Sequence, residues 1–111
     1  MSSNETAVAG NITHLLAKEV DPLVAAIARV AHEVCAAYAV SCGDYANLPW
    51  DQLTDTEQSR AHAKVQMFLN TPGMPATSGM APVATLTAQE RSTAYIFQGV
   101  VAAIAREQNR V

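Results

Sequence analysis

Apolar residues recur at steps of three and four along four segments of the chain, which is the spacing of one face of a helix. The segments are 6–20, 22–42, 55–70 and 88–105. The residues expected on the buried faces are Val8, Ile12, Leu15, Leu16 and Val20; Leu23, Ile27, Val30, Ala31, Val34 and Tyr38; Ala61, Val65, Phe68 and Leu69; and Ala94, Phe97, Val101 and Ile104. Gly10 and Asn11 interrupt the first segment, whereas the other three patterns are continuous.

The second segment has clear start and stop signals. Asp21 has a side chain that can cap a helix, and Pro22 suits the first helical position because it needs no backbone N–H there. Gly43 follows the last apolar residue and tolerates the left-handed conformation found at helix ends. We therefore expect a helix from residue 22 to about residue 42.

Two capping boxes mark the starts of the later helices. They are Thr54-Asp55-Thr56-Glu57 and Thr87-Ala88-Gln89-Glu90, in which the threonine and the glutamate each bond the other's backbone N–H. Asp51 is a competing cap for the third helix, which should end before Pro72-Gly73. The last helix is expected to fray from Arg106 onward.

The loop over 72–86 is rich in proline and glycine and has no helical repeat. Its stretch Val83–Leu86 could be extended, which leaves room for a short hairpin. A loop of this length is usually functional or disordered. The sequence therefore predicts an all-α fold: a single small domain of three to four helices over 6–107, after a disordered start at 1–5 and before a polar tail at 108–111.

The composition narrows the classes of partner. Half of the residues are hydrophobic, 15% are charged, and the formal net charge is −3. The seven basic residues are scattered without a run or stripe, which argues against binding nucleic acid through its phosphates. A surface so poor in charge is covered either by small polar residues or by a subunit interface, and we therefore expect a homo-oligomer.

The apolar run over 22–42 has the length of a membrane span. Arg29, His32 and Glu33 lie near its middle, which favours a core helix and no membrane partner. Residues 1–13 lack the basic region and apolar core of a signal peptide, so a cytoplasmic location is expected.

The two cysteines, Cys35 and Cys42, lie about two helical turns apart, or ~10 Å along one helix. This separation is too large for a disulfide bond. We expect both to be buried free thiols in a reducing compartment.

Several short motifs follow one another along the chain. They are Val30-Ala31-His32-Glu33-Val34 with Ala37-Tyr38, then Gly43-Asp44, Pro49-Trp50-Asp51, Leu86-Thr87-Ala88-Gln89-Glu90-Arg91 and Tyr95-Ile96-Phe97-Gln98-Gly99-Val100-Val101. In this order they resemble the ryanodine-receptor repeat (RyR) domain in its short bacterial and phage form. The similarity covers roughly 28–69 and 86–105.

The chain departs from the family pattern at three places. It lacks the family's central tryptophan and Gly-Trp-x-Tyr-Gly hairpin, where it has a Pro/Gly/Met loop over 72–82. Thr93-Ala94 replaces a Lys-Asp pair, and Ala63-Lys64 replaces an Asn-Gly. The resemblance thus implies a shared scaffold with an altered pocket. It further implies a phage or prophage protein in the host bacterial cytoplasm that binds a nucleotide-like ligand in conflict between phages and bacteria.

Seven residues are candidates for lining such a pocket: Arg29, Glu33, Tyr38, Tyr45, Trp50, Arg91 and Tyr95. Arg29 and Glu33 interrupt an apolar helix, although their spacing also suits an ion pair within the helix. Tyr45 and Trp50 flank a turn, and Trp50 either plugs the core or stacks on a planar ligand.

The remaining candidates are equally open to two interpretations. Tyr38 and Tyr95 fall on apolar helix faces, where core packing is the simpler role and each buried hydroxyl needs a partner. Arg91 lies in the first turn of the last helix, either exposed or beside a helix start that suits a phosphate. Arg60, His62 and Lys64 alternate along their helix and are not expected to share one face, so we expect them to be solvated.

No group of residues predicts catalysis or a metal site. His32 and Glu33 are adjacent on a helix and point about 100° apart. The sequence His32-Glu33-Val34-Cys35-Ala36 lacks the second histidine of a His-Glu-x-x-His zinc site. His32 and Cys35 are spaced to touch, but a packed cysteine beside a surface histidine is the simpler interpretation of that pair.

Two functions therefore remain open. One is a non-enzymatic binding module that senses or sequesters a nucleotide-derived ligand between the helix over 29–38, the loop over 45–50 and the start of the last helix. The other is a structural or interaction protein whose helices form a homo-oligomer with no small ligand. An enzyme is disfavoured because no paired acid and base are evident, and no cofactor is expected.

Overall fold

The structure, a computed structural model, describes residues 20–80 and 82–109. Its elements are α2 (Pro22–Ser41), η1 (Trp50–Gln52), α3 (Asp55–Asn70), η2 (Val83–Thr85) and α4 (Ala88–Gln108). The predicted helix over 6–20 and the predicted disordered start at 1–5 lie outside the described residues, apart from Val20. The described part contains helices and no strand, which confirms the all-α fold.

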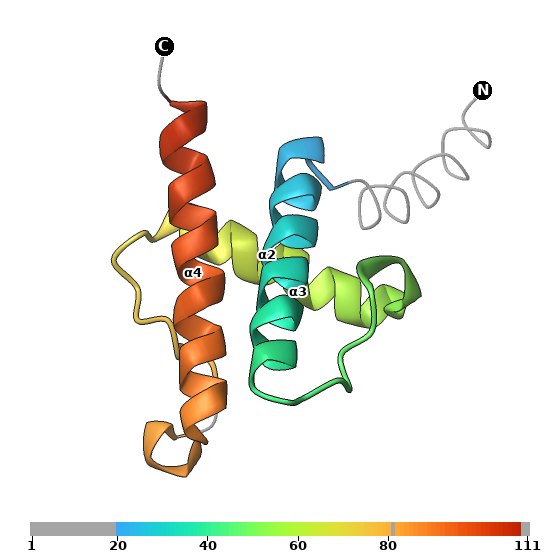
Figure 1. The fold of residues 1–111 in the computed structure, drawn as a ribbon. Helices are drawn as coiled ribbons and strands as arrows, with labels where there is room; N and C mark the ends of the chain where they lie inside the picture. The colour runs from blue at the N-terminus through green and yellow to red at the C-terminus, as the bar shows by residue number, and fades with distance from the viewer. Residues whose placement is uncertain (1–19, 81, 110–111) are drawn as a thin grey trace, which may run out of the picture.

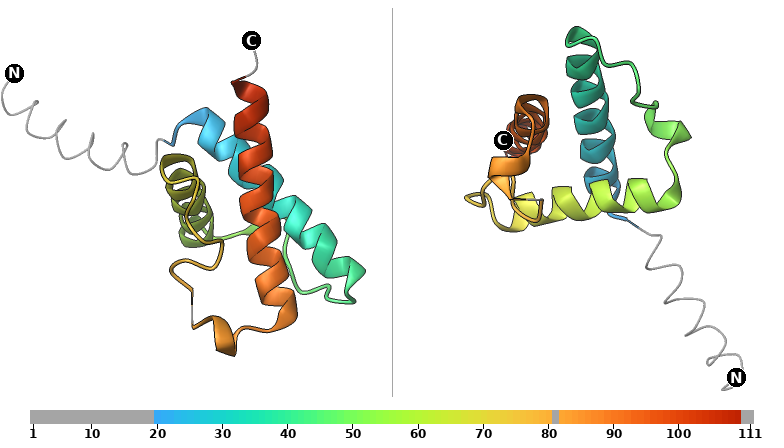
Figure 2. Two further views of the ribbon diagram at one scale, coloured as in Figure 1. Left: turned by 90° about the vertical axis from the view of Figure 1, so that its left-hand side faces the viewer. Right: turned by 90° about the horizontal axis from the view of Figure 1, so that it is seen from below.

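The two longest helices, α2 and α4, run in opposite directions and form the largest helix pair, and α3 crosses behind both of them (Figure 1). Seen from below, α3 lies across one side of this pair (Figure 2). Each helix therefore contacts the other two, and the core lies where the three meet.

The predicted caps are confirmed. Asp21 accepts a hydrogen bond from the backbone N–H of Leu23 at 2.8 Å, and Pro22 opens α2. Both capping boxes form, at Thr54 with Glu57 and at Thr87 with Glu90. A capping box satisfies two backbone N–H groups that the helix itself leaves without partners, so these positions define the helix starts.

Three boundary predictions differ from the structure. Asp51 does not cap α3 but lies within η1, one turn earlier. Val83–Thr85 forms a turn of 3₁₀ helix and not an extended segment, because the backbone N–H of Thr85 bonds the carbonyl of Pro82. The helix α4 continues past Arg106 to Gln108.

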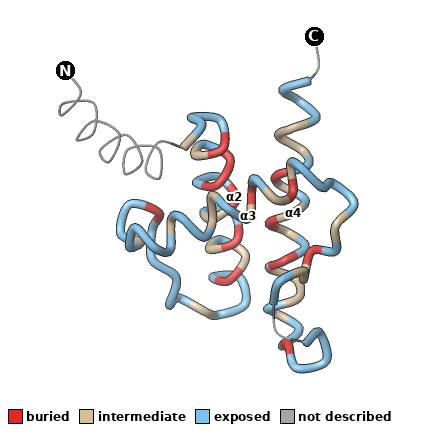
Figure 3. Tube along the Cα trace, turned by 180° about the vertical axis from the view of Figure 1, so that it is seen from behind, coloured by how far each residue is buried: buried red, intermediate tan, exposed pale blue. Residues whose placement is uncertain are grey.

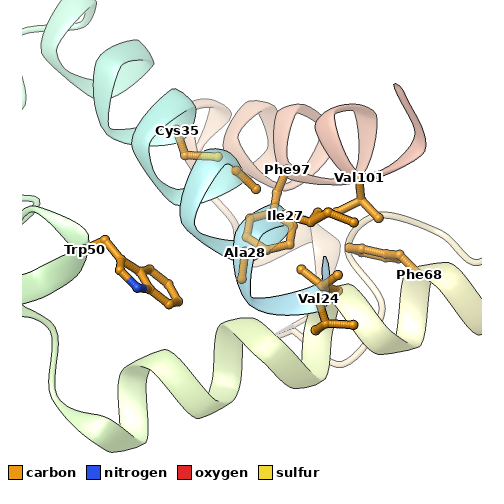
Figure 4. Close-up of a cluster of buried hydrophobic side chains, with 10 residues drawn as sticks. Val24, Ile27, Ala28, Cys35, Trp50, Phe68, Phe97 and Val101 are labelled. Carbon is orange, nitrogen blue, oxygen red and sulfur yellow. The ribbon is translucent and has the colours of Figure 1, made fainter. Parts of the chain in front are cut away.

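The core is a cluster of side chains from all three helices and η1 (Figure 4). It consists of Val24, Ile27, Ala28, Ala31, Cys35, Trp50, Val65, Phe68, Phe97 and Val101. The rings of Phe68 and Phe97 lie 6.3 Å apart at its centre. Burying a large aliphatic side chain such as Ile27 contributes about 1.5–3 kcal/mol.

The predicted buried face of α2 is partly wrong. Leu23, Val30 and Val34 are exposed, at 40%, 45% and 40% of their surface, while Ala28 and Ala39 are buried. Figure 3 shows that buried and exposed positions both occur along α2. The helix is apolar almost all round, so spacing alone did not identify the contact face. Alanines on that face let α3 and α4 approach closely, so Ala28, Ala31 and Ala39 are buried beside Val24 and Ile27.

By length and composition, α2 could also cross a membrane, and it is the one such helix in the described part of the chain. The core helix of a soluble protein passes the same test. Within this domain α2 packs against both α3 and α4 and carries Arg29 and Glu33 near its middle. The fold is thus compatible with a soluble protein.

Candidate functional site

The connection from α2 to α3 is fastened to α2 by three polar contacts. Gly43 turns the chain at the end of α2 with a φ of 86°, a conformation that glycine adopts without strain. His32 Nε2 then lies 2.7 Å from the carbonyl oxygen of Leu48, and Glu33 Oε2 accepts the backbone N–H of Trp50 at 2.8 Å. The His-Glu and Pro-Trp motifs therefore meet in space, and the side chains of His32 and Glu33 hold the connection.

Arg29 makes the third contact. Its two terminal nitrogens donate to the two carboxylate oxygens of Asp51 at 3.2 and 3.1 Å. Both side chains are largely in water, at 55% and 72% exposure. A surface ion pair of this kind contributes at most about 1 kcal/mol, so it orients the connection more than it stabilises it. Arg29 pairs with a residue 22 positions away and not with Glu33 of its own helix.

Trp50 is a core side chain, as one of its two predicted roles required. It is 7% exposed and lies between two histidine rings, at 5.8 Å from His32 and 5.5 Å from His62. Gln58 donates to the Trp50 carbonyl at 2.9 Å. Since its ring, its backbone N–H and its backbone carbonyl are all engaged by the protein, this tryptophan joins the connection to α2 and α3.

His62 has an unusual environment beside that ring. Among the described residues, its Nε2 is the one buried side-chain nitrogen or oxygen without a hydrogen-bond partner. Burial lowers the pKa of His62 below its ordinary value, because the charged imidazolium loses hydration there. The neutral ring is therefore the form that packs on Trp50.

The other four predicted ligand residues make none of these contacts with the connection after α2. Tyr45 and Tyr95 are 76% and 62% exposed, and Tyr38 is half-buried. Arg91 donates to the carbonyl of Leu86 at 3.1 Å, which ties the start of α4 to the preceding turn. The structure brings together Arg29, Glu33 and Trp50 at the junction of α2 and η1, and Arg91 and Tyr95 share a face of α4 away from that junction.

A cavity of about 710 Å³ opens between α2, α3, α4 and the connection after α2. This volume lies within the range of small-molecule sites. Its walls combine the apolar Phe97 and Leu53 with polar side chains from all three helices, among them His32, Lys64 and Gln89. None of the seven predicted ligand residues lines this cavity.

The carboxylates that line this cavity are already engaged by N–H groups of the chain. Asp44 accepts from the backbone of Ala46 at 3.0 Å and from Gln89 at 2.9 Å. Glu57 and Glu90 accept from the backbones of their capping threonines. These hydrogen bonds hold the pKa of Asp44 and that of Glu57 below their usual range. All three therefore act first as structural acceptors.

The two cations of the cavity are less engaged. Lys64 Nζ lies 4.8 Å from the centre of the Phe97 ring, a cation–π contact, and Arg60 lies one turn earlier on the same face of α3. Neither forms an ion pair with a carboxylate among the described residues. The cavity thus presents two positive charges with free donors next to an aromatic wall.

The expectation that the basic residues within 60–64 are all solvated is wrong for two of them. Lys64 is half-buried over Phe97, and His62 is half-buried against Trp50, while Arg60 is exposed. Arg60 and Lys64 are four residues apart and share a helix face, whereas His62 points elsewhere. The four-residue spacing was therefore the signal in the sequence for this pair of cations.

Cys35 also borders the cavity, but its chemistry is unreactive. Its Sγ donates to the carbonyl of Thr93 at 3.5 Å, and burial raises the pKa of the thiol. A raised pKa disfavours the thiolate that a nucleophile requires. The prediction of free thiols is confirmed for both cysteines, whereas Cys42 is exposed and not buried as expected.

No family model, no curated protein and no solved structure matches this chain. The resemblance to the ryanodine-receptor repeat therefore stays a prediction from its motifs. Among the described residues, no three His, Cys, Asp or Glu side chains gather closely enough to hold a metal ion.

Proposed function

We propose that this protein is a non-enzymatic binding module that holds a small acidic ligand in the cavity between α2, α3 and α4. The observation that carries the proposal is the pair of cations, Arg60 and Lys64, on the wall of a cavity of about 710 Å³. Neither forms an ion pair among the described residues, although the charge of Arg60 acts on the Glu57 carboxylate, and a bound acidic group would pair with both cations.

The cavity walls favour a ligand with a planar or apolar part as well as an acidic group. Phe97, Leu53 and Ala94 form an apolar wall, and Gln89 and His32 offer hydrogen bonds at its rim. Small-molecule sites commonly combine an apolar lining with a few polar groups that fix orientation. A nucleotide or a nucleotide derivative has this division into a flat base and a phosphate, which agrees with the ligand class that the family resemblance implies.

The site proposed here differs from the seven residues predicted from the sequence. Arg29, Glu33 and Trp50 support it indirectly, because they fix the connection that forms one side of the cavity. If the family resemblance holds, the protein senses or sequesters its ligand in the bacterial cytoplasm during conflict between phages and bacteria. Such a role needs binding and no chemical step.

A thermal-shift panel of mono-, di- and cyclic nucleotides and ADP-ribose derivatives tests the proposal. A ligand that binds only the folded state at a hundred times its Kd stabilises it by about 2.7 kcal/mol. For a domain of this size we expect Tm to rise by about 10 °C.

Arg60→Gln and Lys64→Gln should each weaken binding about 10- to 100-fold, since a hydrogen bond to a charged group is worth about 1.5–3 kcal/mol. Arg106→Gln is the matched control, because Arg106 lies in the last turn of α4 and does not line the cavity. The proposal fails if no compound shifts Tm at millimolar concentration, or if the two cavity variants bind as tightly as the control.

A further inference from the structure

An exposed stripe of apolar and small side chains runs along α2 on the side away from the core. It consists of Leu23, Ala26, Val30, Val34 and Ala37, here called the α2 stripe. Leu23, Val30 and Val34 expose 40–45% of their surface, and both alanines are exposed. No charged residue belongs to it. A continuous apolar face of this kind usually marks an interaction surface.

The spacing of the stripe is that of a two-helix seam. Its residues follow one another at steps of three, four, four and three, a mean of about 3.5 residues, which is the repeat of helices that pack along their length. They occupy an arc of about 80° on the helix. The stripe thus has the geometry needed to receive a second helix.

The order of large and small residues along the stripe indicates that the second helix is α2 of another copy of this chain. When two copies of α2 are set antiparallel with a two-fold axis at Val30, Leu23 faces the partner's Ala37, and Ala26 faces the partner's Val34. Val30 then faces the partner's Val30. Every large residue off the axis meets a small one, which is the arrangement that lets two helices interdigitate. The stripe is therefore complementary to itself.

Charge selects the same orientation. Arg29 and Glu33 lie on one flank of the stripe, with the positive charge nearer the N-terminus of α2. Reversing the second helix brings Arg29 near the partner's Glu33, two residues from the position that faces Arg29 in the register of the stripe. In a parallel pair the two charged flanks would lie on opposite sides of the seam, and this contact would be lost. Arg29 is 55% exposed and uses two of its five donors on Asp51, so it has donors left for this contact.

From these observations we infer that two copies of this chain associate through the α2 stripe, antiparallel and with a two-fold axis at Val30. The stripe lies on the face of α2 opposite His32 and Ala39, which border the cavity. The dimer therefore leaves the cavity open, and this inference does not depend on ligand binding. Each subunit would present its own cavity on the outer side.

Sedimentation equilibrium of the full chain over a range of concentrations tests the dimer. The mass should approach twice the 11.8 kDa of the monomer. Val30→Glu places two like charges on the two-fold axis and should weaken dimerisation at least tenfold. Val83→Glu is the matched control, since Val83 is exposed to a similar extent, at 51% against 45% for Val30, and lies on η2. Circular dichroism of both variants verifies that each is folded.

Disulfide trapping tests the orientation. In a Cys42→Ser background and a glutathione redox buffer, Leu23→Cys protein mixed with Ala37→Cys protein should give a crosslinked heterodimer. Each protein alone should remain uncrosslinked. Crosslinking of each protein with itself would indicate a parallel pair and overturn the inference.

Three further outcomes would also overturn it. One is a monomer at every concentration. A second is a dimer that Val30→Glu leaves intact. The third is binding of the chain to phospholipid vesicles through the stripe in place of dimerisation, which would assign this face to a membrane surface.

Discussion

Replacing Trp50 by alanine should remove the plug that joins α2, η1 and α3. The side chain is 7% exposed, and its ring lies against both His32 and His62. Removing a buried tryptophan ring costs about 3–5 kcal/mol, because the lost apolar contacts and the remaining cavity add together. Domains of this size have a total stability of only about 5–15 kcal/mol. The variant should therefore lose at least about 12 °C in Tm.

Urea denaturation followed by the helical circular-dichroism signal measures this loss, since Trp50 is the sole tryptophan and its fluorescence disappears in the variant. Trp50→Phe is the matched control, because it keeps an aromatic ring in the same place and should lose less than half as much. A loss below about 1 kcal/mol for Trp50→Ala would place it among ordinary surface substitutions and refute the structural role. Trp50 would then be available for a ligand, as the alternative interpretation of the sequence held.

Three other predictions follow from the same contacts. Arg29→Ala should cost less than about 1 kcal/mol in urea denaturation, since its pair with Asp51 is exposed, and a larger cost would show a buried role. Thr87→Ala should lower the stability of the domain by about 1 kcal/mol through loss of a cap, while an unchanged Tm would show that α4 does not depend on it. His62 has a lowered pKa in the folded state, so its contribution is fully present above its ordinary value of about 6.5 and is lost as the pH falls toward the folded value. Tm should therefore drop between pH 7.5 and 5.5, and His62→Phe should flatten that slope; an equal slope in both proteins would exclude His62 as its source.

The helix boundaries were predictable because their causes are local. Asp21 and the two capping threonines, Thr54 and Thr87, act within three residues of themselves, so sequence spacing is sufficient to find them. The buried face of α2 was not predictable in the same way. Leu23 and Ala28 are both apolar, and only contact with α3 and α4 decides that the alanine is the one inside.

The site, like the fold, has features that follow from the local sequence and others that depend on contacts between distant residues. The burial of Trp50 was one of two roles that the sequence allowed, but its bond to Glu33 and the pairing of Arg29 with Asp51 span 17 and 22 residues. Such pairings depend on how the connection folds back. The cavity combines side chains from three helices, and no local pattern specifies it. The four-residue spacing of Arg60 and Lys64 is a local signal for one part of it, but the alternation of Arg60, His62 and Lys64 was interpreted as a solvated helix face.

The most direct test of the account is to map where a nucleotide binds, by following the backbone amide resonances of the isotopically labelled chain during titration with AMP. The account predicts that the shifts concentrate at the residues around the cavity cations, including Lys64, Gln89 and Phe97, and leave Arg106, which lies outside the cavity lining, unchanged. Shifts centred on residues outside the cavity lining, or no shifts at millimolar AMP, would contradict a nucleotide site in this cavity.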